Sequence, residues 1–265
     1  MHNFLLLFSS IDSSLGRVDK ASLPQQTLME LLIDGITNKH SICGDPEAVK
    51  PLHEWKSVTL NSSEEVILIS WGFLWLEGCI DLRWVPPTTC ELYLNLNAFH
   101  GSLDLNELPP PLEILYVYGN KFSGSVNLTT LPPVLDDLML SKNELSGSID
   151  LEHLPESLTK LDLSSNHFTG SISLTRLPKK MLILSISRNT FSGALDLTCL
   201  PDGMKSLYLI QNEFSGWTDF SKLPQSLSFL SLYRNTELSG EITIDEEEQH
   251  DFGVTKTKVT LHIRE

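Results

Sequence analysis

Apolar residues recur along most of the chain in units of 23 residues. A Leu-Pro pair marks each unit, and one Val-Pro pair extends the series toward the N-terminus. The pairs are Val85-Pro86, Leu108-Pro109, Leu131-Pro132, Leu154-Pro155, Leu177-Pro178, Leu200-Pro201 and Leu223-Pro224. Each unit also holds a segment such as Leu161-Asp162-Leu163, whose period-two alternation predicts a short strand with one buried face. Because such units stack on their neighbours, we expect a parallel sheet that gains one strand per unit.

The positions after each predicted strand repeat as well. First comes an asparagine, whose amide can pair with backbone groups where the chain leaves the strand. These residues are Asn97, Asn120, Asn143, Asn166, Asn189, Asn212 and Asn235. A large apolar residue follows two positions later, as in Phe99 and Phe122, and predicts a continuous core along the stack. A glycine comes next, and the segment after it, such as Ile149-Asp150-Leu151, predicts a second extended stretch.

Together these motifs give the consensus LPxxLxxLxLxxNxFSGxIDLxx. Its LxxLxLxxNxF half resembles that of leucine-rich-repeat proteins, and SGxIDL is similar to the LSGxIP of plant-type repeats. The Leu-Pro opening resembles repeats of bacterial effectors, and the mixture is most similar to 23-residue repeats of kinetoplastid and other protist proteins. The resemblance covers roughly residues 55–245. It implies an α/β repeat solenoid, a horseshoe with a parallel β-sheet on its concave face.

The chain divides into four parts on this basis. Residues 1–21 are an unassigned tail, 22–84 form an N-terminal cap with a helix and a degenerate first repeat, 85–245 hold seven repeats, and 246–265 form an acidic loop and a capping strand. The acidic residues are Glu241, Asp245, Glu246, Glu247, Glu248 and Asp251, and the strand pattern runs from Val254 to Ile263. We expect that last strand to be an edge whose Lys256, Lys258, His262 and Arg264 discourage further pairing.

Local signals in the cap predict its helix and its packing. Ser22-Leu23-Pro24-Gln25 has the form of a capping box with an early proline, and Leu28, Leu31, Leu32 and Ile36 form one apolar side. Four of the five tryptophans lie in this first third of the chain, which favours a packed cap over an aromatic ligand cage. They are Trp55, Trp71, Trp75 and Trp84.

Signals for the cellular compartment oppose one another. The segment from Trp55 to Leu60 resembles the WxGVxC cap of plant-type repeats, but its cysteine positions hold His53 and Leu60, so the extracellular cap disulfide is missing. That departure favours a reducing, cytoplasmic setting. The sequons at Asn61 and Asn127 favour a secreted or cell-surface setting. Met1–Gly16 is open to two interpretations, a plain tail and a truncated signal peptide.

Charge and motif content exclude several classes of function. The 19 basic and 34 acidic residues give a net charge of −15, which argues against a nucleic-acid partner. No apolar run approaches the ~20 residues of a transmembrane helix. The four cysteines and eight histidines show no metal-site spacing, and no catalytic or nucleotide-binding motif is present, so we expect neither enzymatic activity nor a cofactor or metal.

Candidate binding residues follow from the expected register. Parallel strands would bring one outward position per unit into a row, and the middle row would read Ser70, Tyr93, Tyr116, Met139, Asp162, Ser185, Tyr208, Ser231. Tyrosine is enriched at interfaces, so its recurrence in these rows indicates a binding surface, although cross-strand stacking that only stabilises the sheet is the alternative. The candidates are Tyr93, Asn95, Tyr116, Tyr118, Met139, Asp162, Arg188, Tyr208, Ile210, Phe229, Tyr233 and Arg234.

The function these patterns favour is a non-catalytic, monomeric module that binds a protein or peptide ligand on the concave face. Two other functions are compatible with the same residues. One is a secreted or surface receptor-like or adhesion protein. The other is the recognition arm of a larger signalling kinase, ligase or effector.

Overall fold

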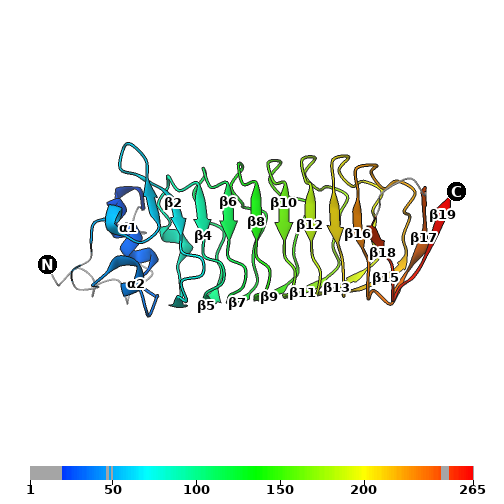
Figure 1. Ribbon diagram of the computed structural model, residues 1–265, viewed down its shortest axis with the longest axis horizontal. Helices are drawn as coiled ribbons and strands as arrows, with labels where there is room; N and C mark the ends of the chain where they lie inside the picture. Colours follow the sequence, from blue (N-terminus) through cyan, green and yellow to red (C-terminus); the bar gives the residue numbers. More distant parts are fainter. Residues whose placement is uncertain (1–19, 46–47, 49, 246–250, 265) are drawn as a thin grey trace, which may run out of the picture.

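A computed structural model describes residues 20–45, 48, 50–245 and 251–264. The chain winds into coils that lie side by side along one long axis, with the cap at one end and the final strands at the other (Figure 1). The predicted repeat solenoid with parallel strands is therefore confirmed. Most of the predicted tail, and Glu246, Glu247 and Glu248 of the acidic loop, lie outside the described residues.

Each coil contributes one strand to a ten-stranded sheet, hereafter the first sheet, in the order β1-β2-β4-β6-β8-β10-β12-β14-β16-β18. All neighbours in it pair in parallel except β1 and β2, which are antiparallel. The strands are β1 Val58–Leu60, β2 Val66–Ser70, β4 Glu91–Tyr93, β6 Ile114–Tyr116, β8 Asp137–Met139, β10 Lys160–Asp162, β12 Ile183–Ser185, β14 Ser206–Tyr208, β16 Phe229–Ser231 and β18 Asp251–Gly253.

The opposite side of each coil forms a second parallel sheet of nine strands. Its strands are β3 Glu77–Gly78, β5 Ala98–Ser102, β7 Lys121–Gly124, β9 Glu144–Gly147, β11 His167–Gly170, β13 Thr190–Gly193, β15 Glu213–Trp217, β17 Glu237–Asp245 and β19 Lys258–Arg264. In the regular coils this strand ends at the glycine, whereas we expected the extended stretch after it. The reason is that each glycine has a left-handed φ, +84° at Gly147 and +86° at Gly170, which turns the chain out of the strand.

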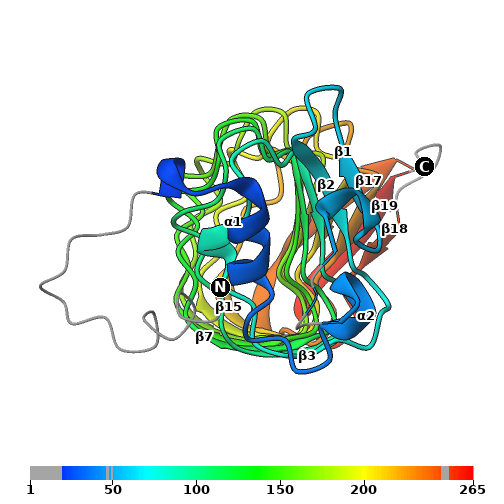
Figure 2. The ribbon, with the colours of Figure 1, turned by 90° about the vertical axis from the view of Figure 1, so that its left-hand side faces the viewer.

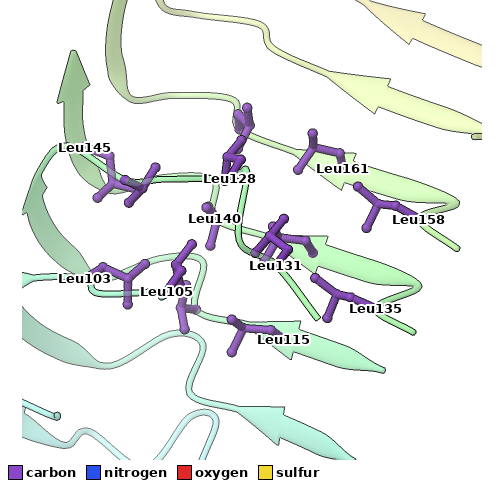
Figure 3. Close-up of a cluster of buried hydrophobic side chains, with 14 of the residues drawn as sticks. Leu103, Leu105, Leu115, Leu128, Leu131, Leu135, Leu140, Leu145, Leu158 and Leu161 are labelled. Atoms are coloured by element: carbon purple, nitrogen blue, oxygen red, sulfur yellow. The ribbon is translucent and has the colours of Figure 1, made fainter. Parts of the chain in front are cut away.

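The space between the two sheets holds the apolar core. Leucines of successive coils point into it from both sides, as Figure 3 shows for Leu115 and Leu161 of the first sheet and Leu145 of the second. The expected row of large apolar residues is fully buried, and Phe168 stacks on Phe191 with ring centroids 6.1 Å apart. Each coil therefore buries its flat faces against its neighbours, as the repeat pattern predicted.

The asparagine ladder is confirmed in detail. Nδ2 of Asn143 donates to the carbonyl oxygens of Leu140 in its own coil and Val117 in the preceding coil, both at 3.1 Å. Its Oδ1 accepts from the amide of Phe122, also at 3.1 Å. The same three contacts recur at each asparagine from Asn120 to Asn235. The ladder thus connects each coil to the one before it.

A cap covers the N-terminal end of the stack (Figure 2). Its helices are α1 Gln25–Leu32 and α2 His40–Cys43, and it also has 3-10 turns at Lys20–Ser22, before α1, and at Leu52–Glu54 and Leu82–Trp84, after α2. The predicted capping box does not form, because α1 begins at Gln25, too late for Ser22 to cap it. The Gln25 side chain instead bonds to backbone groups of Glu64 and Val66 and ties the helix to β2.

The four cap tryptophans do not share one environment. Trp55 and Trp71 are buried, and their indole N–H groups donate to the carbonyl oxygens of Lys50 and Lys56. Trp84 is half-buried, whereas Trp75 is 83% exposed. The prediction of a packed tryptophan cap is therefore wrong for Trp75, whose position in a turn of the degenerate coil points it away from the core.

The C-terminal end is closed by two strands. β18 ends the first sheet beside β16, and β19 ends the second sheet beside β17 over seven paired residues. Lys258 and His262 of β19 pair with Glu237 and Glu241 of β17. The edge strand of the second sheet, β19, carries these charged side chains. It starts at Lys258 and not at Val254, because the chain turns at Lys256, where φ is +60°.

Candidate functional site

The outward face of the first sheet carries the predicted row in register. Tyr93 lies beside Tyr116, Tyr116 beside Met139, and Met139 beside Asp162. The row continues through Ser185 and Tyr208 to Ser231 in the same register. We call this surface the ladder face. The chain has five tyrosines in all: Tyr93, Tyr116 and Tyr208 belong to this row, and Tyr118 and Tyr233 to the row two residues further along each coil, which also holds Asn95 and Ile210.

One end of the ladder face holds the first aromatic cluster, formed by Tyr93, Tyr116 and Tyr118. All three side chains are half-buried. The rings of Tyr93 and Tyr116 meet edge to face with centroids 5.2 Å apart, and Tyr118 lies 6.1 Å from Tyr116 at an interplanar angle of 54°. Aromatic pairs favour these geometries, so the three rings pack against one another on the surface of the sheet.

Carboxylates accept hydrogen bonds from two hydroxyl groups of this cluster. Tyr93 Oη donates to Glu91 Oε2 at 2.6 Å, and Tyr116 Oη donates to Asp137 Oδ2 at 2.8 Å. Burial, followed by the hydrogen bond to Glu91, raises the pKa of Tyr93 to about 12. Burial and the bond to Asp137 raise the pKa of Tyr116 as well. Both phenols therefore stay neutral hydrogen-bond donors well above the pH at which a free tyrosine ionises.

Asp137 is the most enclosed charged group of this surface. It is 3% exposed, and its Oδ2 also lies 3.3 Å from Lys160 Nζ. Its Oδ1 is buried and has no hydrogen-bond partner among the described residues. An unpaired buried carboxylate oxygen carries a desolvation penalty of about 1–3 kcal/mol or more, so this site holds an unused acceptor.

The second aromatic cluster, Tyr208, Phe229 and Tyr233, lies toward the other end. The rings of Tyr208 and Phe229 are 4.5 Å apart. Tyr233 stands between two cations, with Arg234 Cζ 5.2 Å and Lys256 Nζ 5.5 Å from its ring. Hydrogen bonding to Lys256, aided by Arg234, lowers the pKa of Tyr233. Tyr233 therefore has cationic neighbours, unlike Tyr93 and Tyr116, whereas Phe229 of the same cluster lies beside Asp251 of β18.

The remaining candidates are spread around these clusters. Met139, Asp162 and Ile210 are half-buried on the rows, and Asp162 Oδ1 accepts the Ser164 amide at 2.9 Å. Arg188 is exposed in the turn after β12. Asn95 is only 5% exposed, because it fills the space beside Gly72, where an added Cβ would lie 2.9 Å from Asn95 Oδ1. Asn95 therefore presents little of its side chain on the ladder face.

Among solved structures, a pollen receptor kinase 3 matches this architecture with a TM-score of 0.51 and 18% identity, over 88% of this chain and 94% of that one. Parallel coils of 23 residues, the asparagine ladder and this neighbour decide the fold. This is a leucine-rich-repeat solenoid. No family model and no curated protein matches the chain.

Two further solved structures lie at lower similarity to the solenoid. A plant ice-binding protein has a TM-score of 0.47 and 16% identity, over 89% of this chain and 94% of that one. The BIR2 ectodomain from Arabidopsis thaliana has a TM-score of 0.45 and 18% identity, over 76% of this chain and 97% of that one.

Sequence reasoning missed an exposed apolar group in the first turns of the solenoid. Phe73 and Trp75 are 65% and 83% exposed, and both have left-handed φ values, +59° and +55°. Phe73 begins a column with one residue per coil, in which every residue has a left-handed φ. The column continues through Leu96, Gly119, Lys142, Ser165, Arg188, Gln211 and Arg234. The 23-residue spacing of this column is visible in the sequence, but the candidate rows were taken from the strand positions, which do not include Phe73 or Trp75.

The two sequons of the solenoid occupy loops. Asn61 is half-buried and its amide donates to Glu65 Oε2 at 2.9 Å. Asn127 is exposed and donates to Asn106 Oδ1, also at 2.9 Å. Glycosylation of either residue stays a prediction.

Other reactive groups lie away from the ladder face. Cys79 Sγ is 3.4 Å from His100 Nδ1 in a cleft of about 450 Å³ near the cap, and a cleft of about 440 Å³ lies beside Trp217 and Phe220. Within the described residues, no three histidine, cysteine or acidic side chains gather as metal ligands. No helix in that part of the chain is long and apolar enough to cross a membrane.

Proposed function

We propose that this solenoid is a non-catalytic interaction module that binds a protein or peptide ligand along the ladder face. The observation that carries the proposal is the placement of all five tyrosines on one outward face, in two clusters. Tyrosine combines a large apolar ring with a polar hydroxyl and loses little entropy on binding, so it serves as an anchor at interfaces.

The dimensions of the ladder face favour an extended ligand. The seven strands from β4 to β16 span roughly 29 Å at ~4.8 Å per strand, which matches about nine residues of extended peptide. Small-molecule sites, by contrast, are enclosed pockets of ~300–1,000 Å³. The clefts of that size are lined by residues outside the rows of the ladder face. A chain laid across the coils would reach both aromatic clusters.

The proposal is tested by affinity capture followed by mass spectrometry, from source-cell lysate and from culture medium. The bait is the whole chain, compared with a variant carrying Tyr93→Ala, Tyr116→Ala and Tyr118→Ala. The matched control carries Glu144→Ala, His167→Ala and Glu213→Ala, three exposed positions of the second sheet. Circular dichroism and thermal melting establish that both variants fold.

A partner that is retained by wild type and the control but lost by the tyrosine variant supports binding on the ladder face. If the folded tyrosine variant retains the same partners as wild type, the tyrosines only stabilise the sheet and the proposal fails. The fraction that supplies the partner also distinguishes a cytoplasmic from a secreted setting.

The exposed Asn127 favours a second candidate, a secreted or cell-surface receptor-like protein. Peptide-N-glycosidase treatment of the protein from its source cells tests it. A mass decrease that is abolished by Asn127→Gln supports this setting, and an unglycosylated protein with reduced cysteines in the cytosolic fraction contradicts it.

A further inference from the structure

The first aromatic cluster lies in an acidic part of the ladder face. Glu91 of β4, Asp137 of β8 and Asp162 of β10 lie on strands beside or near the rings, and Lys160 is the one basic side chain on these three strands. Three carboxylates against one ammonium leave the surface with excess negative charge. A cationic ligand group would therefore be attracted here.

The geometry of Asp137 adds a second, independent feature. Its Oδ2 already serves Tyr116 and Lys160, yet Oδ1 is enclosed without a donor among the described residues. The residue belongs to the outward positions of β8, whereas Leu138 beside it is in the core. Because Oδ1 has almost no accessible surface, Asp137 acts on a ligand over this strand through its negative charge, which a cationic group close to the rings would compensate.

The rings supply the third feature. The edge-to-face arrangement of Tyr93 and Tyr116 leaves ring surface next to the carboxylates. A guanidinium can stack on an aromatic ring and donate to a carboxylate at the same time, because it is planar and carries five N–H donors. An ammonium offers no plane to stack, and a neutral urea group offers no charge.

We infer that the first aromatic cluster, with Asp137 and Glu91, is a subsite for a guanidinium group, so that the ligand places an arginine side chain over strands β4 to β8. This inference rests on the proposed function, because it assumes that a ligand lies along the ladder face. It also favours one direction for that ligand, since Arg234 and Lys256 disfavour a second cationic group at Tyr233.

The test uses small probes and the five tyrosine signals. The protein is labelled at tyrosine for NMR and titrated with Nα-acetylarginine amide, with the uncharged isostere Nα-acetylcitrulline amide, and with Nα-acetyllysine amide. Tyr93, Tyr116 and Tyr118 report on the proposed subsite, and Tyr208 and Tyr233 are internal references. Asp137→Asn and Glu91→Gln remove the two carboxylates, and Asp150→Asn, at an exposed loop carboxylate, is the matched control.

We expect arginine amide to shift the first-cluster signals saturably, with citrulline amide and lysine amide at least about tenfold and threefold weaker, respectively. Asp137→Asn should weaken arginine binding about tenfold, since it removes a charged acceptor, and Asp150→Asn should not change it. Thermal melting establishes that Asp137→Asn folds, and Glu91→Gln repeats the test at an accessible position with a severalfold loss.

The inference is overturned if citrulline or lysine amide binds as well as arginine amide, if both carboxylate variants bind normally, or if no signal shifts saturably. It is also overturned if Tyr208 and Tyr233 respond equally. Failure of the arginine subsite can be distinguished from failure of the proposed function. A partner lost by the tyrosine variant but retained by Asp137→Asn and Glu91→Gln leaves the proposed function standing and removes the arginine subsite.

Discussion

The two aromatic clusters of the ladder face occupy the same backbone setting, but their tyrosine hydroxyls and rings have neighbours of opposite charge. Tyr116 and Tyr208 both lie in the middle row, with the same register to their neighbours. Around the first cluster the phenols donate to carboxylates, and the pKa of Tyr93 rises to about 12. In the second cluster Tyr233 contacts two cations, and its pKa falls.

This comparison distinguishes the backbone geometry, which the solenoid sets for every coil, from the side-chain charge, which differs between coils. Parallel pairing sets the spacing and direction of each row, because every coil repeats one backbone path. The charges of a cluster come from single positions in the neighbouring coils, such as Asp137 beside the first and Lys256 beside the second. Surface chemistry can thus vary from end to end of one sheet without any change of fold.

The largest expected effect comes from breaking the scaffold between the clusters. Asn143→Ala would leave Val117 O, Leu140 O and the Phe122 amide without their partner in a buried site. At about 1–3 kcal/mol for each unpaired group, we expect a loss of about 3 kcal/mol or more in the free energy of unfolding. Urea denaturation measures it. Glu144→Ala, an exposed neighbour, should stay within ~0.5 kcal/mol, and an equal effect of the two would contradict the ladder's role.

A smaller loss of stability should distinguish the two clusters when one tyrosine hydroxyl is removed from each. Tyr116→Phe keeps the ring but removes the hydrogen bond to Asp137, so we expect a loss of about 1–2 kcal/mol in stability, allowing for the half-exposed ring. Tyr208→Phe is the matched change in the second cluster and should cost less than ~0.5 kcal/mol. Chemical denaturation of both variants provides the measurement. Equal losses would mean that the Asp137 contact contributes nothing.

An alkaline titration of the five tyrosine ring signals sharpens the comparison. Relative to the ordinary value of 10.0, Tyr233 should ionise at lower pH, and Tyr93 and Tyr116 at higher pH. The native Tyr93 keeps a proton that the unfolded chain loses, so its contribution to stability is complete below about pH 10 and is lost by about pH 12. Tyr233 contributes in the opposite direction. Ionisation of Tyr93 before Tyr233 would refute the electrostatic contrast.

The smallest expected effect reports on the charge next to the first cluster. Burial, then Glu113 and Glu91, raise the pKa of Cys90, so its thiolate is scarce at pH 8. Iodoacetamide should modify Cys90 more slowly than the exposed Cys199. Glu91→Gln should accelerate modification of Cys90 by less than about threefold, because charge pairs at an accessible surface are worth under ~1 kcal/mol. Peptide mapping by mass spectrometry follows each thiol, and a slower Cys90 in the variant would contradict this account.

Repetition explains which features could be predicted from sequence. The register of Tyr93 with Tyr116 and the contacts of Asn143 recur every 23 residues, so one coil predicts the next. The enclosure of Asp137 has no such signal, since it depends on a Tyr116 hydroxyl one coil earlier and a Lys160 side chain one coil later. Trp75 lies in the degenerate coil, where composition indicated a buried cap and only the turn geometry places the side chain outside.

The asparagine ladder gives the stack a direction. Each asparagine completes the hydrogen bonding of the coil that precedes it, as Asn97 Oδ1 does when it accepts from the backbone amides of Leu74 and Leu76. Leu74 occupies the asparagine position of its own coil and has no side-chain amide. A coil is thus finished only by its successor. Removing units from the N-terminal end would cost the first remaining asparagine one acceptor, as Asn143 would lose Val117 O, whereas removing Asn235 would strip both Leu209 O and the Phe214 amide of their partner. Variants with fewer or additional units should therefore tolerate changes at the start of the array better than changes at its end.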